Sequence, residues 1–363
     1  MRPDTFAYVA DLVRRRSAIR VEPGKEYLVE SRLGPLARAH GLDLDDYVQR
    51  LRQGATEGEL TGVVEAMTIN ETSWFRDVGP FAALRPHVLP LLRGAGLGDR
   101  LRVWSAACST GQEPYSILMA LADEPAVPVD VLATDLNEQV LDRARSGEYS
   151  QLEVNRGLPA PALVRYFERA GAQWRVKAEL RSRVQFRRHN LLDPAPGGPF
   201  DLVFCRNVLI YFDVATKRAV LDRIARVLRP GGLLVLGAAE TTLGVHEGFE
   251  RVEAGALVLH RPVAGGSTAG PATAAGPASA AGPASAPLGT PTPRGVPVPL
   301  GAPTPRGVPV PLGSPFAVAS PAPLPVVSAF GTSRPAAAAA LPAPRTTART
   351  TPPATAPSQR GQS

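Results

Sequence analysis

From about residue 101 onward, short apolar runs alternate with amphipathic stretches, and this alternation restricts the possible folds more than any other feature of the chain. It is typical of a parallel sheet whose faces are covered by helices. The apolar runs predict strands over residues 101–105, 129–134, 184–188, 202–205 and 233–237. The amphipathic stretches predict helices over residues 114–121, 137–145 and 214–228. We therefore predict an α/β fold for this part of the chain.

The segment before residue 71 has a different pattern, which predicts short helices. Apolar residues recur there at the i, i+3, i+4, i+7 spacing that places side chains on one face of a helix. The two sets with this spacing are Leu44, Tyr47, Val48 and Leu51, and Leu60, Val63, Val64 and Met67. Residues 1–70 are therefore expected to form a helical domain.

Two further segments of the α/β part are expected to contain β structure. Residues 146–183 are too many for an ordinary connection between a helix and a strand, so they should contain structure of their own. Trp174 and Val176 alternate with polar residues as in a strand, which indicates a small inserted subdomain. Residues 249–252 and 257–260 are expected to form a closing hairpin at the edge of the main sheet.

Residues 263–363 are dominated by Pro, Ala, Gly, Ser and Thr. Such a composition cannot bury enough apolar surface to offset the entropy of ordering the chain, so we expect a disordered tail. Within the tail, PTPRGVPVPLG begins at Pro291 and again at Pro303. The proline content favours extended polyproline II, either as a solvated linker or as a ligand for a proline-binding partner.

The net charge of +7 would suit a nucleic-acid-binding protein, but much of that charge lies in the tail. The tail contains six arginines and no Lys, Asp or Glu. Removing these six charges leaves the folded part near +1, so we do not expect the fold to bind nucleic acid.

The two cysteines, Cys108 and Cys205, have no spacing that suggests a zinc site or a disulfide framework. The five histidines also lack the spacing of metal ligands, so we expect no metal. No apolar run approaches the ~20 residues of a membrane span, and the first residues do not resemble a secretory signal. We therefore expect a cytoplasmic protein without membrane insertion, in which both thiols are reduced, buried and unreactive.

The loop after the first predicted strand indicates a cofactor site. Residues 106–113 (AACSTGQE) follow that strand, and the second strand ends at Asp135, where a carboxylate can accept bonds from ribose hydroxyls. Nicotinamide enzymes share this layout, but their G-x-G-x-x-G loop lets a helix N-terminus approach a pyrophosphate. Gly111 is the single glycine here, which favours S-adenosylmethionine over a nicotinamide cofactor and makes an oxidoreductase the weaker alternative.

Several segments resemble the successive signatures of CheR methyltransferases, in the order in which that family has them. They are residues 68–77 (TINETSWFRD), 102–116 (RVWSAACSTGQEPYS), 133–149 (ATDLNEQVLDRARSGEY), 190–193 (NLLD) and 200–213 (FDLVFCRNVLIYFD). Residues 229–232, followed by 233–240, resemble the family's Pro-Gly turn into a late strand. The resemblance covers about residues 1–262.

The resemblance implies an N-terminal all-helical domain (1–70) and a class I, Rossmann-like methyltransferase domain (71–262) with a seven-stranded sheet. It also implies a small antiparallel β-subdomain inserted at about residues 146–183, with the disordered tail (263–363) after the fold. The implied activity is transfer of a methyl group from S-adenosylmethionine to glutamate side chains on the cytoplasmic helices of chemoreceptors, with S-adenosylhomocysteine as the product. We expect a monomer. The alternative function is a signalling scaffold that binds the cofactor without catalysis.

The resemblance also implies the residues of the site. Those around the cofactor are Asn70, Thr72, Arg76, Glu113, Asp135, Asn190, Leu191, Arg206 and Asn207. Asp135 would hold the ribose, Asn190 and Leu191 would flank the adenine, and Arg206 with Asn207 would close the site. Arg76 and Tyr211 resemble the pair placed near the transferable methyl group, and are the expected catalytic residues.

Taken one at a time, these residues have simpler interpretations. Asp135 suits a helix N-cap as well as a ribose ligand, and Asn70 and Thr72 suit turns. Arg76 suits a surface ion pair, and Tyr211 suits a core position with a satisfied hydroxyl. The order of the motifs favours the functional interpretation.

Two features bear on the receptor partner. Arg14, Arg15, Arg16 and Arg20 form a basic cluster that either steers acidic receptor helices or is an ordinary solvated helix face. The insertion is short between residues 167 and 176, where some family members carry a longer loop that docks a receptor's C-terminal peptide. We therefore expect methylation that does not depend on such a peptide.

Overall fold

The structure is a computed structural model that describes residues 1–123 and 128–263. The disorder expected for the tail, and the proline-binding partner expected for its repeat, concern residues that lie outside the described ones. Within the described residues, no helix combines the length and the apolar character needed to cross a bilayer.

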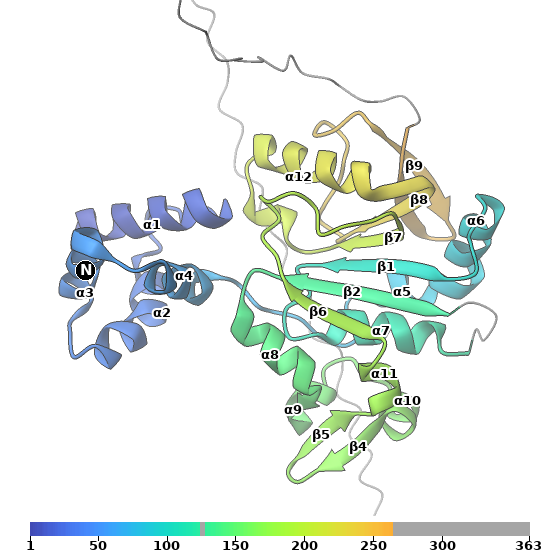
Figure 1. The fold of residues 1–363 in the computed structure, drawn as a ribbon, viewed down its shortest axis with the longest axis horizontal. Coiled ribbons are helices and arrows are strands. Elements are labelled where there is room, and N and C mark those ends of the chain that lie inside the picture. Colours follow the sequence, from blue (N-terminus) through green and yellow to red (C-terminus); the bar gives the residue numbers. More distant parts are fainter. Residues whose placement is uncertain (124–127, 264–363) are drawn as a thin grey trace, which may run out of the picture. The chain divides into compact units, whose positions relative to one another are not determined.

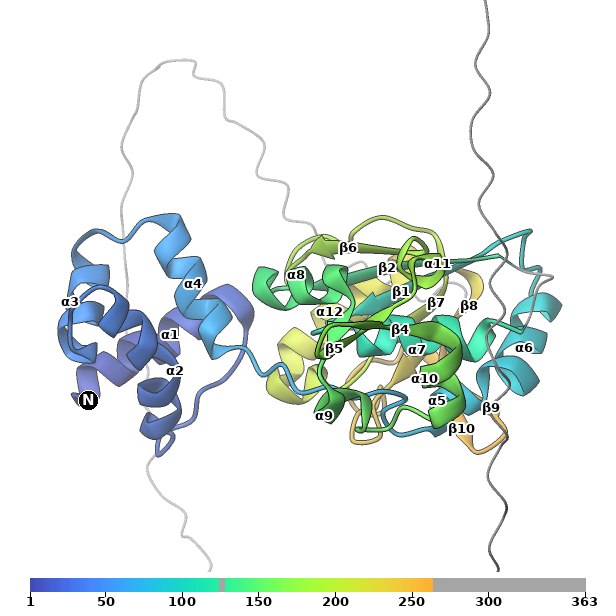
Figure 2. The same ribbon diagram turned by 90° about the horizontal axis from the view of Figure 1, so that it is seen from below.

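The first part of the chain is a bundle of four helices with its own core, as the spacing of apolar residues predicts (Figure 2). These helices are α1 (Pro3–Ser17), α2 (Glu26–Ala39), α3 (Leu44–Gly54) and α4 (Glu57–Met67). Val9, Leu33 and Tyr47 from three different helices meet in this core. Side chains cap the starts of α3 and α4. Asp43 accepts from the Asp46 N–H at the start of α3, and Thr56 and Glu59 form a capping box at the start of α4.

The second part is built around a seven-stranded sheet in the order β6-β2-β1-β7-β8-β10-β9 (Figure 1). The strands are β1 (Leu101–Ala106), β2 (Val129–Asp135), β6 (Val184–Arg188), β7 (Phe200–Cys205), β8 (Leu228–Leu236), β9 (Phe249–Ala254) and β10 (Leu257–Pro262). The first five are parallel, and β10 pairs antiparallel with β8 and β9. The α/β fold and the edge hairpin predicted from the sequence are confirmed.

Helices cover both faces of this sheet. α7 (Gln112–Leu121) and α8 (Glu138–Ser146) pack on one face, and α12 (Val214–Val227) packs on the other (Figure 1). Successive residues of β1 alternate between the two cores, since Val103 belongs to the first and Trp104 to the second. Every residue of β7 is buried, as expected for a central parallel strand.

The sequence did not predict the helical segment that precedes β1. It consists of α5 (Gly79–Ala82), a π-helical turn over Leu84–Val88 and α6 (Leu89–Gly94). Its buried side chains, Phe81, Leu84 and Leu92 among them, join the core on the α7 face. Prolines at positions 80, 86 and 90 interrupt the segment, which hides its helical period from a reading of the sequence.

The predicted insertion is a three-stranded antiparallel sheet with short helices. Its elements are β3 (Glu148–Tyr149), α9 (Gln151–Val154), α10 (Ala160–Tyr166), β4 (Phe167–Ala170), β5 (Gln173–Val176) and α11 (Ala178–Arg181). The strand order is β3-β5-β4. Trp174 lies in β5 as predicted, and the Arg169 guanidinium lies 4.0 Å from the centroid of its ring.

The predicted Pro-Gly turn before the last parallel strand is wrong in its placement. β8 begins at Leu228, and residues 229–232 form a bulge within it, because Phe200 pairs with Leu228 while Leu202 pairs with Leu233. Gly231 has φ 79°, and a Cβ at this position would lie 2.5 Å from the Ala95 Cβ. The bulge therefore requires glycine both for its backbone conformation and for its contact with the α6 end.

Candidate functional site

A pocket lies at the carboxyl ends of β1, β2 and β7, where a doubly wound sheet places its ligands. It encloses about 880 Å³, its open mouth included. All the residues predicted for the site line this one pocket: Asn70, Thr72, Arg76, Glu113, Asp135, Asn190, Leu191, Arg206, Asn207 and Tyr211. The structure thus brings together residues that are spread over more than a third of the chain.

The loop between β1 and α7 is held in an unusual backbone conformation. Ala107 and Ser109 have φ 62° and 51°, which non-glycine residues adopt uncommonly. Gly111 has φ 92°, and a Cβ there would lie 2.8 Å from the Ala144 Cβ and 3.1 Å from the Tyr149 hydroxyl oxygen. The single glycine of this loop is therefore needed for close packing against α8.

Asp135 connects the end of β2 to this loop. Its Oδ2 accepts from the Ser109 N–H at 2.8 Å, and its Oδ1 accepts from the Asn137 N–H at 3.0 Å. Burial raises the pKa of the Asp135 carboxyl, and the backbone donors oppose that rise. The helix N-cap interpretation of Asp135 is wrong, because the N-cap of α8 is Asn137, whose side chain accepts from the Gln139 and Val140 N–H groups.

Arg206 forms a buried charge network beneath the pocket. Its side chain is 1% exposed, and its Nη1 donates to Glu113 Oε2 at 3.0 Å. Nη2 donates to Asp77 Oδ2 at 2.7 Å and to the Arg76 carbonyl at 2.8 Å. Burial raises the pKa of Glu113, while the Arg206 charge and the Ser105 hydroxyl oppose that rise. The guanidinium therefore joins the loop after β7 to the segment that carries Arg76.

Arg76 and Tyr211, the predicted catalytic pair, both line the pocket. Arg76 Nη1 donates to the Glu71 carbonyl at 2.9 Å, and within the described residues Arg76 forms no ion pair. Tyr211 lies in the 3₁₀ turn Leu209–Tyr211, is half-buried, and has a pKa raised by burial, an effect that the nearby Arg76 charge opposes. The surface ion pair considered for Arg76 is thus not found there.

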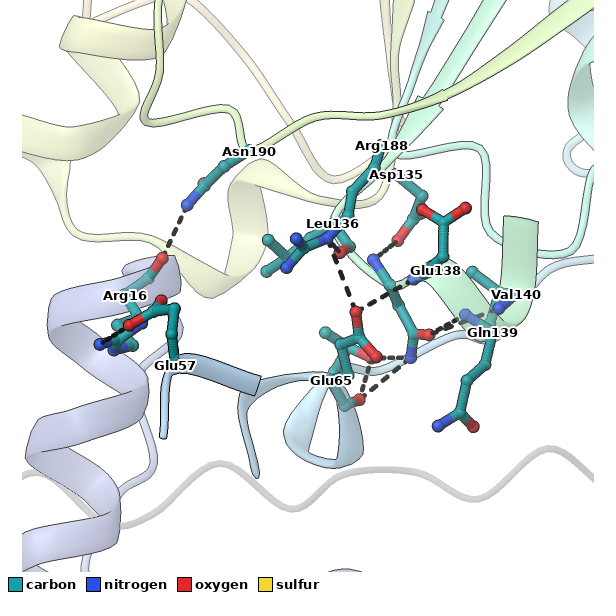
Figure 3. Close-up of polar contacts among 12 residues, drawn as sticks. Arg16, Glu57, Glu65, Asp135, Leu136, Glu138, Gln139, Val140, Arg188 and Asn190 are labelled. Atoms are coloured by element: carbon teal, nitrogen blue, oxygen red, sulfur yellow. Dashed lines mark hydrogen bonds and ion pairs between the residues drawn. The ribbon is translucent and has the colours of Figure 1, made fainter. Parts of the chain in front are cut away.

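The side of the pocket lined by Asn190 also includes residues at the end of α1 and just after it. Asn190 Nδ2 donates to the Arg16 carbonyl at 2.7 Å (Figure 3), and its Oδ1 accepts from the Leu192 N–H at 3.1 Å. Ser17 and Ile19, which follow Arg16, line the pocket. Neither was predicted from the sequence, because no local pattern indicates which residues of a distant helix will contact the sheet.

A second group of contacts joins α4 to the start of α8. Asn137 Nδ2 donates to the Glu65 carbonyl at 3.1 Å and to Thr68 Oγ1 at 3.0 Å. Glu65 Oε1 accepts from the Glu138 N–H at 3.2 Å and lies 3.6 Å from Arg188 Nε (Figure 3). Asn137 therefore caps α8 and binds α4 at once. Its position just before an amphipathic stretch is an N-cap signal that the sequence already contained.

The two thiols are buried, as predicted. Cys108 lies in the pocket loop and Cys205 at the end of β7, and burial raises the pKa of each well above the ordinary thiol value. Both therefore stay protonated at neutral pH, in keeping with the prediction that they are unreactive.

Comparison with known proteins identifies the family. Residues 70–258 match the family model described as CheR methyltransferase, SAM binding domain. Residues 4–68 match the model described as CheR methyltransferase, all-alpha domain. The chain belongs to the CheR methyltransferase family. It is therefore an S-adenosylmethionine-dependent methyltransferase, and the nicotinamide-dependent alternative and the non-catalytic scaffold are both set aside.

Similar CheR relatives occur in several bacteria. Chemotaxis protein methyltransferase 1 of Pseudomonas aeruginosa is 47% identical over 247 residues, which cover 65% of this chain and 90% of that relative. Chemotaxis protein methyltransferase Cher2 of Pseudomonas putida is 44% identical with the same coverage. The chemotaxis protein methyltransferase of Escherichia coli is 38% identical over 245 residues, which cover 65% of this chain and 83% of that relative. The two family models end at residue 258, before the proline-rich tail.

Proposed function

We propose that this enzyme methylates glutamate side chains on the cytoplasmic helices of chemoreceptors, with S-adenosylhomocysteine as the second product. The observation that carries the proposal is the presence of Arg76 and Tyr211 in the same pocket as Asp135. One pocket thereby offers groups for an adenosine and groups that can orient a carboxylate.

The residues of the pocket suit S-adenosylmethionine. The Asp135 carboxylate has enough lone pairs to accept from ribose hydroxyls in addition to its backbone donors. Leu191 and Ile19 supply apolar surface for a flat base, next to the backbone of Asn190. Glu113 supplies a buried negative group for the ammonium of the amino-acid part, with Asn70, Thr72, Arg206 and Asn207 completing that end.

The chemistry places few demands on acid–base groups. S-adenosylmethionine supplies a sulfonium methyl group to an incoming carboxylate. A glutamate side chain has a pKa of ~4.3 and is ionised at neutral pH, so the pocket needs no general base. Opposite charges are lost as the ester forms, so alignment of the two reactants should provide most of the acceleration. Arg76 would orient the carboxylate through its planar donors, and Tyr211 would supply a hydroxyl and an aromatic edge.

Ion pairs within the chain neutralise part of the basic cluster formed by Arg14, Arg15, Arg16 and Arg20. Arg15 pairs with Asp11 at 2.8 Å, and Arg16 pairs with Glu57. Arg14 and Arg20 form no ion pair within the described residues. We infer that these two contribute most to attracting acidic receptor helices, which would raise the association rate more than the affinity. The enzyme would act as a cytoplasmic monomer, without needing a receptor C-terminal peptide.

Transfer of a radiolabelled methyl group to receptor cytoplasmic fragments tests the proposal. The label should be released as methanol in alkali, because a glutamate methyl ester is hydrolysed there and an N-methyl group is not. If none of the receptor fragments took up alkali-labile label, the proposed substrate would be contradicted.

Substitution of Arg76 tests the catalytic assignment. Arg76→Ala should lower kcat by about 100-fold, because the carboxylate loses its alignment. Arg76→Lys should recover little of this loss, since an ammonium lacks the planar pair of donors. Arg85→Ala is the control, because Arg85 is an exposed arginine that pairs with Asp123 and does not line the pocket. A normal kcat for Arg76→Ala would remove Arg76 from the proposed site.

A further inference from the structure

Four backbone N–H groups converge on the carboxylate of Glu240. Its Oε1 accepts from Val208 at 2.9 Å and from Leu209 at 2.7 Å. Its Oε2 accepts from Asn207 at 2.8 Å and from Gly237 at 2.7 Å. Three of these donors belong to the loop that follows β7. The sequence motifs predicted no role for Glu240, although it is the last residue of the final segment that resembles the family.

Within the described residues, Glu240 is the side chain that accepts from the first N–H groups of this loop. Asn207 has φ 58°, and the 3₁₀ turn Leu209–Tyr211 begins without a side-chain cap from Val208, its N-cap residue. The first N–H groups of such a turn have no partner inside it. Glu240 takes the place of the missing cap, and a carboxylate suits the task because it accepts and never donates.

The packing around Gly237 indicates that the arrangement is tight. A Cβ at Gly237 would lie 2.7 Å from Glu240 Oε2, 2.9 Å from the Asn207 backbone nitrogen and 2.9 Å from Asn207 Nδ2. Any side chain here would displace the carboxylate, the Asn207 backbone or both. Glycine is thus required at the end of β8 by the approach of these two groups.

The loop held by Glu240 supplies Arg206, Asn207 and Tyr211 to the cofactor pocket. Glu240 itself does not line that pocket; it lines a neighbouring one together with Asp77 and Gly237. We propose that Glu240 is a positioning residue, which fixes the loop from Arg206 to Tyr211 so that it meets the cofactor and the methyl acceptor. The inference rests on the proposed roles of Asn207 and Tyr211.

Glu240→Gln is the variant that tests this role. A glutamine keeps the size of the side chain, but its amide nitrogen would face two backbone N–H groups. An amide nitrogen cannot accept hydrogen bonds, so these two N–H groups would lose their acceptor. The dissociation constant for S-adenosylhomocysteine and the KM for S-adenosylmethionine should each rise about tenfold, equivalent to ~1.4 kcal/mol. The KM for the receptor fragment should stay unchanged, and kcat should fall. A purely structural role would lower the melting temperature and leave both cofactor constants unchanged in folded protein.

Asp201→Asn is the matched control. Asp201 is also a buried carboxylate that accepts from a backbone N–H, that of Arg102, and it pairs with Arg229 at the opposite end of β7. This variant should lose stability but bind S-adenosylhomocysteine normally, when measured at a temperature at which circular dichroism shows a folded chain.

Gly237→Ala provides a second variant if Glu240→Gln does not fold, because its Cβ displaces the same groups. Normal S-adenosylhomocysteine affinity in folded Glu240→Gln or Gly237→Ala would overturn the inference. The titration needs no methyl acceptor, so its outcome is separate from the proposed substrate. If the wild-type enzyme binds S-adenosylhomocysteine but labels no receptor glutamate, the proposed function fails while this inference is still tested.

Discussion

Asp135 and Glu113 are two buried carboxyl groups of the pocket whose pKa values are raised by loss of solvent. A carboxyl whose pKa is higher in the folded than in the unfolded chain takes up its proton first in the folded state. Its contribution therefore favours folding below the unfolded pKa and is lost as the pH rises through the folded pKa. Above their folded pKa values, burial of the two charged carboxylates lowers the free energy of unfolding.

Cofactor affinity should depend on pH through Asp135. Only the ionised carboxylate offers all its lone pairs to the ribose, so protonation competes with binding. As the pH is lowered from 8, the dissociation constant of S-adenosylhomocysteine should begin to rise at a higher pH than an ordinary aspartate would give, because burial raises the Asp135 pKa. Titration calorimetry across this range measures the effect, with a limiting slope of about tenfold per pH unit.

Asp135→Asn is the control for this pH dependence. It should bind more weakly at pH 8 and show a flatter profile, since the titrating group is gone. The same profile in wild type and variant would assign the pH dependence to another group, such as Glu113.

At the same scale, the residues predicted for the site line one pocket, in part because parallel strands end at one edge of a sheet. Asp135 is the last residue of β2, and Glu113 and Asn207 follow the ends of β1 and β7, so their meeting follows from the strand order. The partners of these residues were not predictable in this way. Asp77 beside Arg206 and the Arg16 carbonyl beside Asn190 depend on contacts between segments 129 and 174 positions apart.

Among the elements, the bulge in β8 contrasts with the regular strands. Of the predicted strands, β6 has the predicted bounds, and its β-branched and aromatic residues, Val184 and Phe186, suit a pleated surface. The bulge escaped prediction because the Pro-Gly pair at 230 and 231 has the same signature whether it precedes a strand or interrupts one. The helices before β1 escaped for a related reason, since prolines broke their apolar period.

Two glycines with the same backbone angle allow the bulge to be tested. Gly231 and Gly96 both have φ 79°. A Cβ added at Gly231 would meet Ala95, whereas a Cβ added at Gly96 would have no other atom within 4 Å. Gly96→Ala should cost about 1 kcal/mol of the free energy of unfolding, from backbone strain alone. Gly231→Ala should cost a further ~1–3 kcal/mol from overpacking. Denaturant unfolding measures both.

In an Ala95→Gly background, Gly231→Ala should cost no more than Gly96→Ala does, because the opposing Cβ is gone. If the extra loss persists there, its origin is not the contact with Ala95.

For the molecule as a whole, Asn137 links α4 to the methyltransferase sheet. Asn137→Ala removes a helix cap, which costs about 1 kcal/mol, and also leaves the Glu65 carbonyl and the Thr68 hydroxyl without this partner. We expect it to lower the free energy of unfolding by ~1–3 kcal/mol more than Asp43→Ala, which removes a cap inside the helical bundle alone. It should also weaken S-adenosylhomocysteine binding, because the Asn137 N–H donates to Asp135 and a shift of this residue would move that carboxylate. Equal losses in the two variants would show that Asn137 acts only as a cap.

Ser17 and Ile19 line the same pocket as residues from the sheet, so a ligand that fills this pocket would contact both the helical bundle and the sheet domain. By mass action, a ligand at a hundredfold excess over its dissociation constant adds about 2.7 kcal/mol to the stability of the state that binds it. Here the state that binds is the one in which the helical bundle packs against the sheet domain. A donor or product bound as proposed should therefore stabilise the packing of the helical bundle against the sheet domain.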